Sequence, residues 1–475
     1  MKDANINFHH EISTEVMRME NFWDYNVWGI ILLLAVLLGS LLVGNALKKG
    51  IPVLRDSLIP TSVLGGTVLV VIAAVYKAAT GNVMFDIALF GGNGTAMLEI
   101  ITYHALALGF IASAFKTSSN KMTKKRTMEI FDTGVTTVAT YLIQAICGMG
   151  ITIVAACIVT DFFSAAGLLL PFGYGQGTGQ ALNYGNIYET QYGFVGGKSF
   201  GLTIAALGFL SASFGGVIHL NIIKKRGKIS ASGDRDKLNN EVVEADNEIP
   251  MQESVDKMTI QIALIFVAYV VAYLLMYLLG LLLPGMKATI YGFNFLLGVL
   301  AATLIKLTIN FLKKKSVIKK EYTNNFLLTR ASNLFFDIMV VAGIAAIRLD
   351  VLEKYWGIML ILGVVGLAVT YAYNRIVAKV LFKEYQEEQF LAMFGMLTGT
   401  ASTGIILLRE VDGDFKTPAA DNLVYQTFPA IVFGFPIMIL ATLAPVKPIF
   451  TLIILILFFA VMNVILFRKQ IFKRK

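Results

Sequence analysis

Long apolar stretches recur along the whole chain, separated by short polar segments. Each is close to the roughly 20 apolar residues that a helix needs to cross a bilayer. The pattern predicts eleven membrane-spanning helices, with boundaries fixed only to within a few residues. The predicted spans are 28–47, 58–77, 96–115, 134–159, 197–223, 259–283, 289–311, 327–347, 355–381, 421–443 and 449–467.

Two further apolar segments are interrupted by small and polar residues. Segments 162–188 and 386–410 each begin apolar and then turn to Gly, Thr, Ser and Gln. Glycine destabilises a helix interior by about 1 kcal/mol relative to Ala. Irregular backbone at membrane depth must be buried in protein or line a wet cavity. Five glycines within 173–185 predict an unwound stretch, and we expect both segments to be re-entrant or broken helices.

The basic residues predict the orientation of the chain. Lys and Arg number 40 against 31 Asp and Glu, a formal net charge of +9. Of these 40, 31 fall in one set of alternate loops and eight in the other. Cytoplasmic loops are enriched in Lys and Arg. The N-terminus is therefore predicted outside and the C-terminus in the cytoplasm, with 162–188 entering from outside and 386–410 from inside.

This topology predicts an all-α integral membrane protein built from two inverted repeats. Each repeat has five spans and one re-entrant segment, and an odd number of spans turns the second repeat upside down. The predicted parts are an extracytoplasmic segment 1–27, a first repeat 28–223, a cytoplasmic linker 224–258 and a second repeat 259–443. An additional span and a basic cytoplasmic tail follow in 444–475.

The two interrupted segments share a short pattern. Both contain Phe-Gly-x-x-x-Gly-Thr, at Phe172–Thr178 in the first and Phe394–Thr400 in the second. Inverted repeats whose broken helices meet near the membrane midplane are typical of secondary transporters. The pattern therefore favours a transporter.

Broken helices offer binding groups for both an ion and an anion. Unwound backbone frees carbonyl oxygens for Na⁺, and the half-helix that follows points N–H groups at a carboxylate. The alternative is that Gly and Thr only permit close helix packing; two matched clusters on opposite sides favour a site. The candidates are Gln176, Gly177, Thr178 and Gly179 in the first segment, and Thr398, Gly399, Thr400, Ser402 and Thr403 in the second.

Several polar residues lie inside predicted spans, where a charge costs roughly 2.5–3.5 kcal/mol on insertion scales. Asp337 lies near mid-span, and a cavity-facing ion-coupling role and a structural pairing are both open. Gln144 is also mid-span and needs a hydrogen-bond partner, so it is a further ion-coupling candidate. Lys306 is better explained by snorkelling, and His104 by packing. Glu99 lies near a span end.

Composition excludes several classes of protein. The chain is 56% hydrophobic and 15% charged, with a mean hydropathy of +0.70, whereas soluble domains are about 45–50% apolar and about 25% charged. Its two cysteines exclude a disulfide framework and a Cys-rich metal site. Because the basic residues sort by loop, no nucleic-acid partner is needed. Gly197-Lys198-Ser199 lacks the earlier glycine of a phosphate loop, and no catalytic set is present, so we expect neither an enzyme nor a cofactor beyond Na⁺.

The first half of the chain resembles the bacterial sodium/glutamate symporter family. The likeness rests on Gly175-Gln176-Gly177-Thr178-Gly179 with Ala181, on Tyr192-Gly193-Phe194, on Gln144 with Gly148 and Gly150, and on Ile59-Pro60 with Gly65-Gly66. The chain departs from the family pattern where Gln176 replaces a histidine. It also departs where Phe172-Gly173-Tyr174 replaces Ser-Gly-Gly.

The resemblance implies a plasma-membrane symporter that imports glutamate or a related small carboxylate with Na⁺. It also implies a homodimer in the lipid bilayer and an elevator-type mechanism. Arg348 and Arg409 are possible partners for a second carboxylate, although both lie near span or hairpin ends. Two alternatives stay open: a cation/proton antiporter using Asp337, His104 and Glu99, and a gated channel whose filter is formed by the tips.

Overall fold

The computed structural model describes residues 21–56, 59–116, 123–225, 248, 255–284, 287–292, 294–412 and 416–471. Within these ranges the regular secondary structure is helical, apart from an isolated bridge between Glu248 and Glu321. Most of the predicted extracytoplasmic segment 1–27 and of the linker 224–258 lies outside the described residues.

In the described part of the first half there are seven α-helices and three short 3₁₀ turns. They are α1 (Tyr25–Gly50), α2 (Pro52–Asp56), α3 (Thr61–Thr80), η1 (Met84–Asp86), η2 (Ala88–Phe90), α4 (Gly94–Phe115), α5 (Lys124–Ile158), η3 (Ser164–Leu168), α6 (Leu169–Tyr192) and α7 (Gly197–Lys225).

Among the described residues, the second half forms eleven α-helices and one 3₁₀ turn. Its elements are α8 (Lys257–Leu282), α9 (Lys287–Gly292), α10 (Asn294–Lys314), α11 (Asn325–Ala345), η5 (Leu349–Tyr355), α12 (Trp356–Leu381), α13 (Gln386–Thr398), α14 (Ala401–Arg409), α15 (Ala419–Tyr425), α16 (Thr427–Leu443), α17 (Pro448–Leu466) and α18 (Arg468–Ile471).

Each of the eleven predicted spans corresponds to a helix or a helix pair. In the described part of the chain, ten helices are long and apolar enough to cross a membrane, and the pair α15 and α16, bent by 48°, makes an eleventh. The helix α5 begins ten residues before the predicted span because Thr123 caps it, accepting a hydrogen bond from the Arg126 backbone N–H at 3.3 Å. The multi-pass membrane architecture is confirmed.

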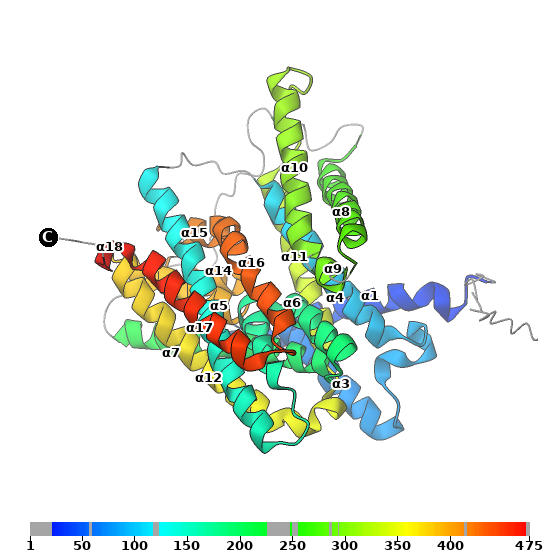
Figure 1. The fold of residues 1–475 in the computed structure, drawn as a ribbon. Helices are drawn as coiled ribbons and strands as arrows, with labels where there is room; N and C mark the ends of the chain where they lie inside the picture. Colours follow the sequence, from blue (N-terminus) through cyan, green and yellow to red (C-terminus); the bar gives the residue numbers. More distant parts are fainter. Residues whose placement is uncertain are drawn as a thin grey trace, which may run out of the picture.

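The long helices form two groups, which differ in the neighbours they pack against (Figure 1). The helices α1, α3, α4, α8, α10 and α11 pack on one another, and we call them the peripheral bundle. The helices α5, α6, α7 and α12–α17 form the core bundle, with α5 against α12, α16 and α17 and with α6 against α7. The two bundles meet where α6 contacts α4 and α11.

The last span belongs to the core bundle. The helix α17 packs along α5, and the Tyr373 hydroxyl of α12 donates to Asn463 Oδ1 of α17 at 2.9 Å. Beyond its end, Arg468 pairs with Asp132 of α5 at 2.8 Å. These contacts fix the additional helix to α5 and α12 of the core bundle.

Candidate transport site

The helix α6 is broken at one residue. Gly177 has φ 79° and ψ −172°, a backbone conformation that is essentially restricted to glycine. The unwound stretch is thus shorter than the glycines of 173–185 predict. The remaining glycines serve close packing instead: a Cβ on Gly173 would lie 2.8 Å from the Ala205 nitrogen, and one on Gly185 would lie 2.5 Å from the Gly197 oxygen.

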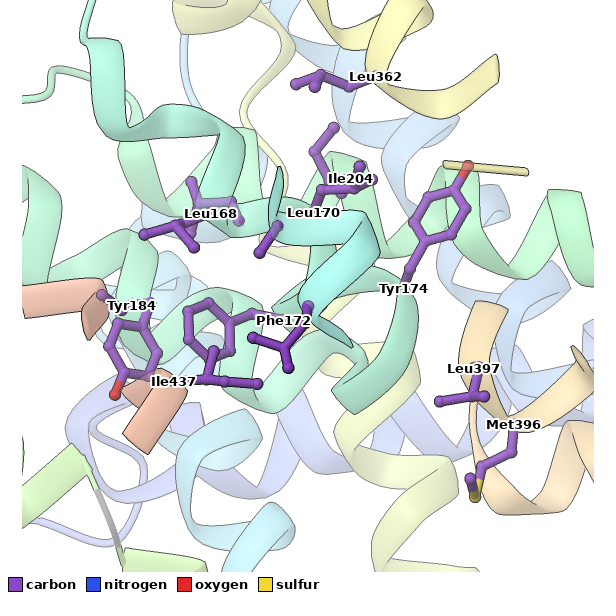
Figure 2. Close-up of a cluster of buried hydrophobic side chains, with 14 of the residues drawn as sticks. Leu168, Leu170, Phe172, Tyr174, Tyr184, Ile204, Leu362, Met396, Leu397 and Ile437 are labelled. Carbon is purple, nitrogen blue, oxygen red and sulfur yellow. The ribbon is translucent and has the colours of Figure 1, made fainter. Parts of the chain in front are cut away.

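The break folds α6 back on itself. The rings of Phe172 and Tyr184 are stacked with their centroids 3.9 Å apart (Figure 2). In a straight helix these residues, twelve apart, would be separated by about 18 Å along the axis. The segment therefore runs to Gly177 and turns back, which makes α6 a hairpin of two half-helices.

The second interrupted segment has the same form. The helix α13 ends at Thr398, Gly399 is non-helical, and α14 begins at Ala401 with Thr400 as its N-cap. A Cβ on Gly395 would lie 2.8 Å from the Gly404 Cα. The two short helices therefore pack against each other closely enough to form a hairpin.

The tips of the two hairpins touch. A Cβ on Gly177 would lie 3.5 Å from Thr400 Cγ2 and 3.7 Å from the Gly399 oxygen. We call this contact the tip junction. Two helices end at the junction and two begin there, so it combines free carbonyl oxygens with free N–H groups. Both positive helix ends lie at the same place.

Side chains of α5 and a backbone carbonyl of α11 hold the tips in position. The Tyr141 hydroxyl donates to the Gly175 oxygen at 3.1 Å, and Gln144 Nε2 donates to the Leu397 oxygen at 2.9 Å. The Thr178 hydroxyl donates to the Met339 oxygen at 3.3 Å. The helix α5 therefore supports both hairpins, one from each half of the chain.

A family model for the sodium/glutamate symporter matches residues 28–416. The chain belongs to the sodium/glutamate symporter family. No curated protein gives a significant match to it. The family match includes both hairpins and ends before α15, so the last part of the chain lies beyond the matched residues.

The symporter brings most of the predicted site residues together at the tip junction. Gln176 and Thr400 are partly exposed there, whereas Thr178, Thr398 and Thr403 are buried. Gly179 packs beside them, with a Cβ position 2.8 Å from a methyl group of Leu106. For Ser402 the structure describes the backbone only.

Three candidates lie away from the junction. Asp337 accepts a hydrogen bond from Ser62 of α3. Met339, two residues later, touches the junction. Because residues two apart lie on opposite faces of a helix, Asp337 occupies the face of α11 away from the junction. Arg348 pairs with Asp350 at 2.9 Å just after α11. Arg409 is the last residue of α14 and is exposed. None of the three side chains faces the tips.

Sequence reasoning misses two residues next to Gln144. Gln144 Nε2 also donates to the Thr370 hydroxyl at 2.8 Å, and Asn374 Nδ2 donates to the Thr140 hydroxyl at 3.3 Å. A signal for them exists in the sequence. The pattern Thr-Tyr-x-x-Gln at 140–144 of α5 matches Thr-Tyr-x-x-Asn at 370–374 of α12.

A pocket of about 430 Å³ lies away from the tips, between the ends of α3 and α11. Asp350 at its rim pairs with Lys77 at 2.7 Å and with Arg348. Burial alone would raise the pKa of Asp350, but these two cations lower it below its usual value. Apart from these three charged residues and Thr95, the pocket is lined by apolar side chains.

Proposed function

We propose that this symporter couples the import of glutamate or a related small carboxylate to Na⁺ at the plasma membrane. The observation that carries the proposal is the tip junction, where Gly177 meets Gly399 and Thr400. Family membership adds Na⁺-coupled transport as the activity class. In this proposal the substrate and the coupling ion are bound at the junction.

The chemistry of the junction suits an anion next to a monovalent cation. The second half of α6, which begins at Thr178, and α14, which begins at Ala401, offer N–H groups to a carboxylate. Carbonyl oxygens at the ends of the preceding helices and the hydroxyls of Thr178 and Thr400 are oxygen ligands for Na⁺. Partial exposure of Gln176 and Thr400 gives the substrate access.

We also propose that the two halves are inverted repeats. Helix contacts support this, because α3 packs on α11 as α10 packs on α4, and α5 packs on α16 as α12 packs on α7. The matched Thr-Tyr-x-x-Gln and Thr-Tyr-x-x-Asn patterns lie on α5 and α12, the fourth spans of the two halves. An outside N-terminus and a cytoplasmic C-terminus follow from the distribution of basic residues.

An elevator motion is the corresponding mechanism. Both hairpins belong to the core bundle, and α4 and α11 of the peripheral bundle pack against the first hairpin, α6. We propose that the core bundle carries the tip junction across the membrane past the peripheral bundle. The homodimer implied by the family resemblance would hold the peripheral bundle still.

The antiporter alternative gains no support from the site. Glu99 pairs with Lys198 at 2.9 Å, His104 bonds to the Tyr269 hydroxyl at 2.6 Å, and Asp337 bonds to Ser62. The three groups have separate partners and do not form one site.

A thermal-shift screen of small carboxylates tests the substrate class. A ligand that binds only the folded state stabilises it by RT ln(1 + [L]/Kd). We expect glutamate or a related carboxylate to raise the unfolding temperature of the purified protein in Na⁺, and to raise it less when K⁺ replaces Na⁺. Stabilisation by no amino acid or dicarboxylate in either salt would contradict the proposal.

A further inference from the structure

The helices α5 and α12 are joined by a reciprocal pair of hydrogen bonds deep in the core bundle. Gln144 of α5 donates to Thr370 of α12, and Asn374 of α12 donates to Thr140 of α5. On α12 the acceptor Thr370 lies four residues before Asn374. On α5 the acceptor Thr140 lies four residues before Gln144. The Asn374 amide also donates to the Thr370 carbonyl at 2.9 Å. Both amides therefore contact Thr370.

The oxygen atoms of these two amides have no donor. Gln144 is fully buried and Asn374 is 2% exposed. Neither Gln144 Oε1 nor Asn374 Oδ1 accepts a hydrogen bond from any described residue. Rotating either amide by 180° would place its oxygen against a backbone carbonyl oxygen, that of Leu397 for Gln144 and that of Thr370 for Asn374. Buried polar groups without a partner are costly and call for an explanation.

Both oxygens belong to amides that contact Thr370, and buried acceptors without donors are suited to a cation. The groups around them are neutral amides, threonine hydroxyls and backbone carbonyls. Among the described residues no cluster of His, Cys, Asp and Glu could hold a metal ion. Divalent ions are usually held with carboxylates, so these neutral oxygens favour a monovalent ion.

We propose that Na⁺ binds at the α5–α12 crossing, with Gln144 Oε1 and Asn374 Oδ1 as ligands. This crossing site is additional to the tip junction, and the inference rests on the proposed Na⁺-coupled function. It assigns ligand roles to Asn374 and to the oxygen of Gln144. Thr140 and Thr370 position the two amides.

The crossing site is connected to the second hairpin. Gln144 Nε2 donates to the Leu397 oxygen, two residues before Gly399. An ion that binds the Gln144 oxygen restricts the whole amide, and therefore also the hydrogen bond to the end of α13. Ion binding at the crossing thereby orders the tip that receives the substrate.

A row of uncharged polar side chains runs from the crossing towards the start of α5. The Thr137 hydroxyl donates to Gln426 Oε1 at 2.9 Å, and Gln389 Nε2 donates to the Thr133 hydroxyl at 3.2 Å. From Thr133 to Gln144 this row spans about 16 Å of helix. The start of α5 is predicted to lie on the cytoplasmic side. An ion that has lost its water would therefore find polar side chains between the crossing and that side.

The test measures Na⁺-dependent thermal stabilisation of the purified full chain without organic substrate, in mixtures of Na⁺ and choline at constant ionic strength. We expect Asn374→Leu and Gln144→Leu each to raise the Na⁺ concentration for half-maximal stabilisation by about tenfold or more. Asn374→Asp keeps an oxygen ligand, and its Na⁺ response should be retained. Asn463→Leu is the matched control, because the Asn463 oxygen already accepts from Tyr373, and its Na⁺ response should equal that of the wild type.

The outcomes separate the two proposals. If the wild type responds to Na⁺ and both leucine variants respond with the same midpoint, the crossing site is wrong and the proposed function stands. If the wild type shows neither Na⁺-dependent stabilisation nor Na⁺-dependent uptake, the proposed function itself is wrong. Should a leucine variant fail to fold, Asn374→Ser replaces it, and an unchanged midpoint in that variant contradicts the crossing site equally.

Discussion

At the scale of single residues, the hydroxyls of Thr178 and Thr400 differ in what they already bond. Thr178 is buried and donates to the Met339 oxygen, whereas Thr400 caps α14 and is partly exposed. The Thr178 hydroxyl donates and so keeps its lone pairs free for an ion, and the Thr400 hydroxyl, which accepts from the Thr403 N–H at 3.5 Å, has a second lone pair. Both side chains can therefore act as Na⁺ ligands without losing their present bonds.

We predict that Thr178→Val and Thr400→Val each lower the apparent Na⁺ affinity of uptake without unfolding the protein. Valine removes the oxygen ligand and nearly keeps the volume. Thr203→Val is the control, since Thr203 is buried in α7 and donates only within its own helix, to the Ser199 oxygen. Unchanged Na⁺ dependence in both tip variants would remove these residues from the ion site.

Gly177 gives a second prediction at this scale. Its φ of 79° disfavours any side chain, although a Cβ would have ordinary van der Waals distances to its neighbours. Gly177→Ala should therefore destabilise the protein by about 1–3 kcal/mol through backbone strain, and should reduce uptake. Gly150→Ala is a matched control, because Gly150 is helical and a Cβ there would meet nothing within 4 Å. Equal unfolding temperatures for the two variants would contradict the strain at Gly177.

At the scale of elements, a buried ion cluster anchors the start of the second hairpin. Arg375 of α12 donates to both oxygens of Glu387 in α13, at 2.6 and 2.8 Å, and His219 of α7 bonds to Glu387 at 3.0 Å. Burial alone would raise the pKa of Glu387, but Arg375 and His219 lower it to about 2. The anchor therefore persists at neutral pH and is lost only as the pH falls from about 4.5 towards 2.

We predict that Glu387→Gln destabilises the protein by about 3–5 kcal/mol, because it leaves Arg375 buried without its carboxylate. The neighbouring Glu388→Gln is the control, since Glu388 is partly exposed. The measurement is the unfolding temperature of each purified variant at pH 7. Equal shifts in the two variants would show that the anchor contributes nothing to stability.

The sequence predicts the positions of the helices more completely than it predicts single contacts. The eleven apolar stretches predict the spans because a bilayer requires long apolar helices, and the helices confirm them. The Gly/Thr runs indicate where α6 and α13 break. They do not show that Gly177 alone is non-helical, since glycines that allow close packing look the same in sequence. The pairing of Gln144 with Thr370 joins residues 226 positions apart, and only the matched Thr-Tyr-x-x-Gln and Thr-Tyr-x-x-Asn patterns link the two helices in the sequence.

At the scale of the whole molecule, the account depends on two bundles with different roles. The core bundle contains both hairpins, the α5–α12 crossing and the additional helix α17, and the peripheral bundle contacts the first hairpin through α4 and α11. Asp337, an ion-coupling candidate from the sequence, lies away from the tips in this arrangement. Its position around the axis of α11 turns its side chain towards α3. Only the three-dimensional packing could distinguish it from Gln144, which is equally polar and equally central in its span.

The most direct test of the central claim is uptake of labelled glutamate into liposomes that contain the purified protein. The account predicts accumulation driven by an inward Na⁺ gradient, its loss when K⁺ replaces Na⁺, and competition from unlabelled small carboxylates. Uptake that is equal in Na⁺ and K⁺ would contradict coupling to Na⁺. Proton movement driven by Na⁺ in the absence of any organic substrate would contradict symport altogether.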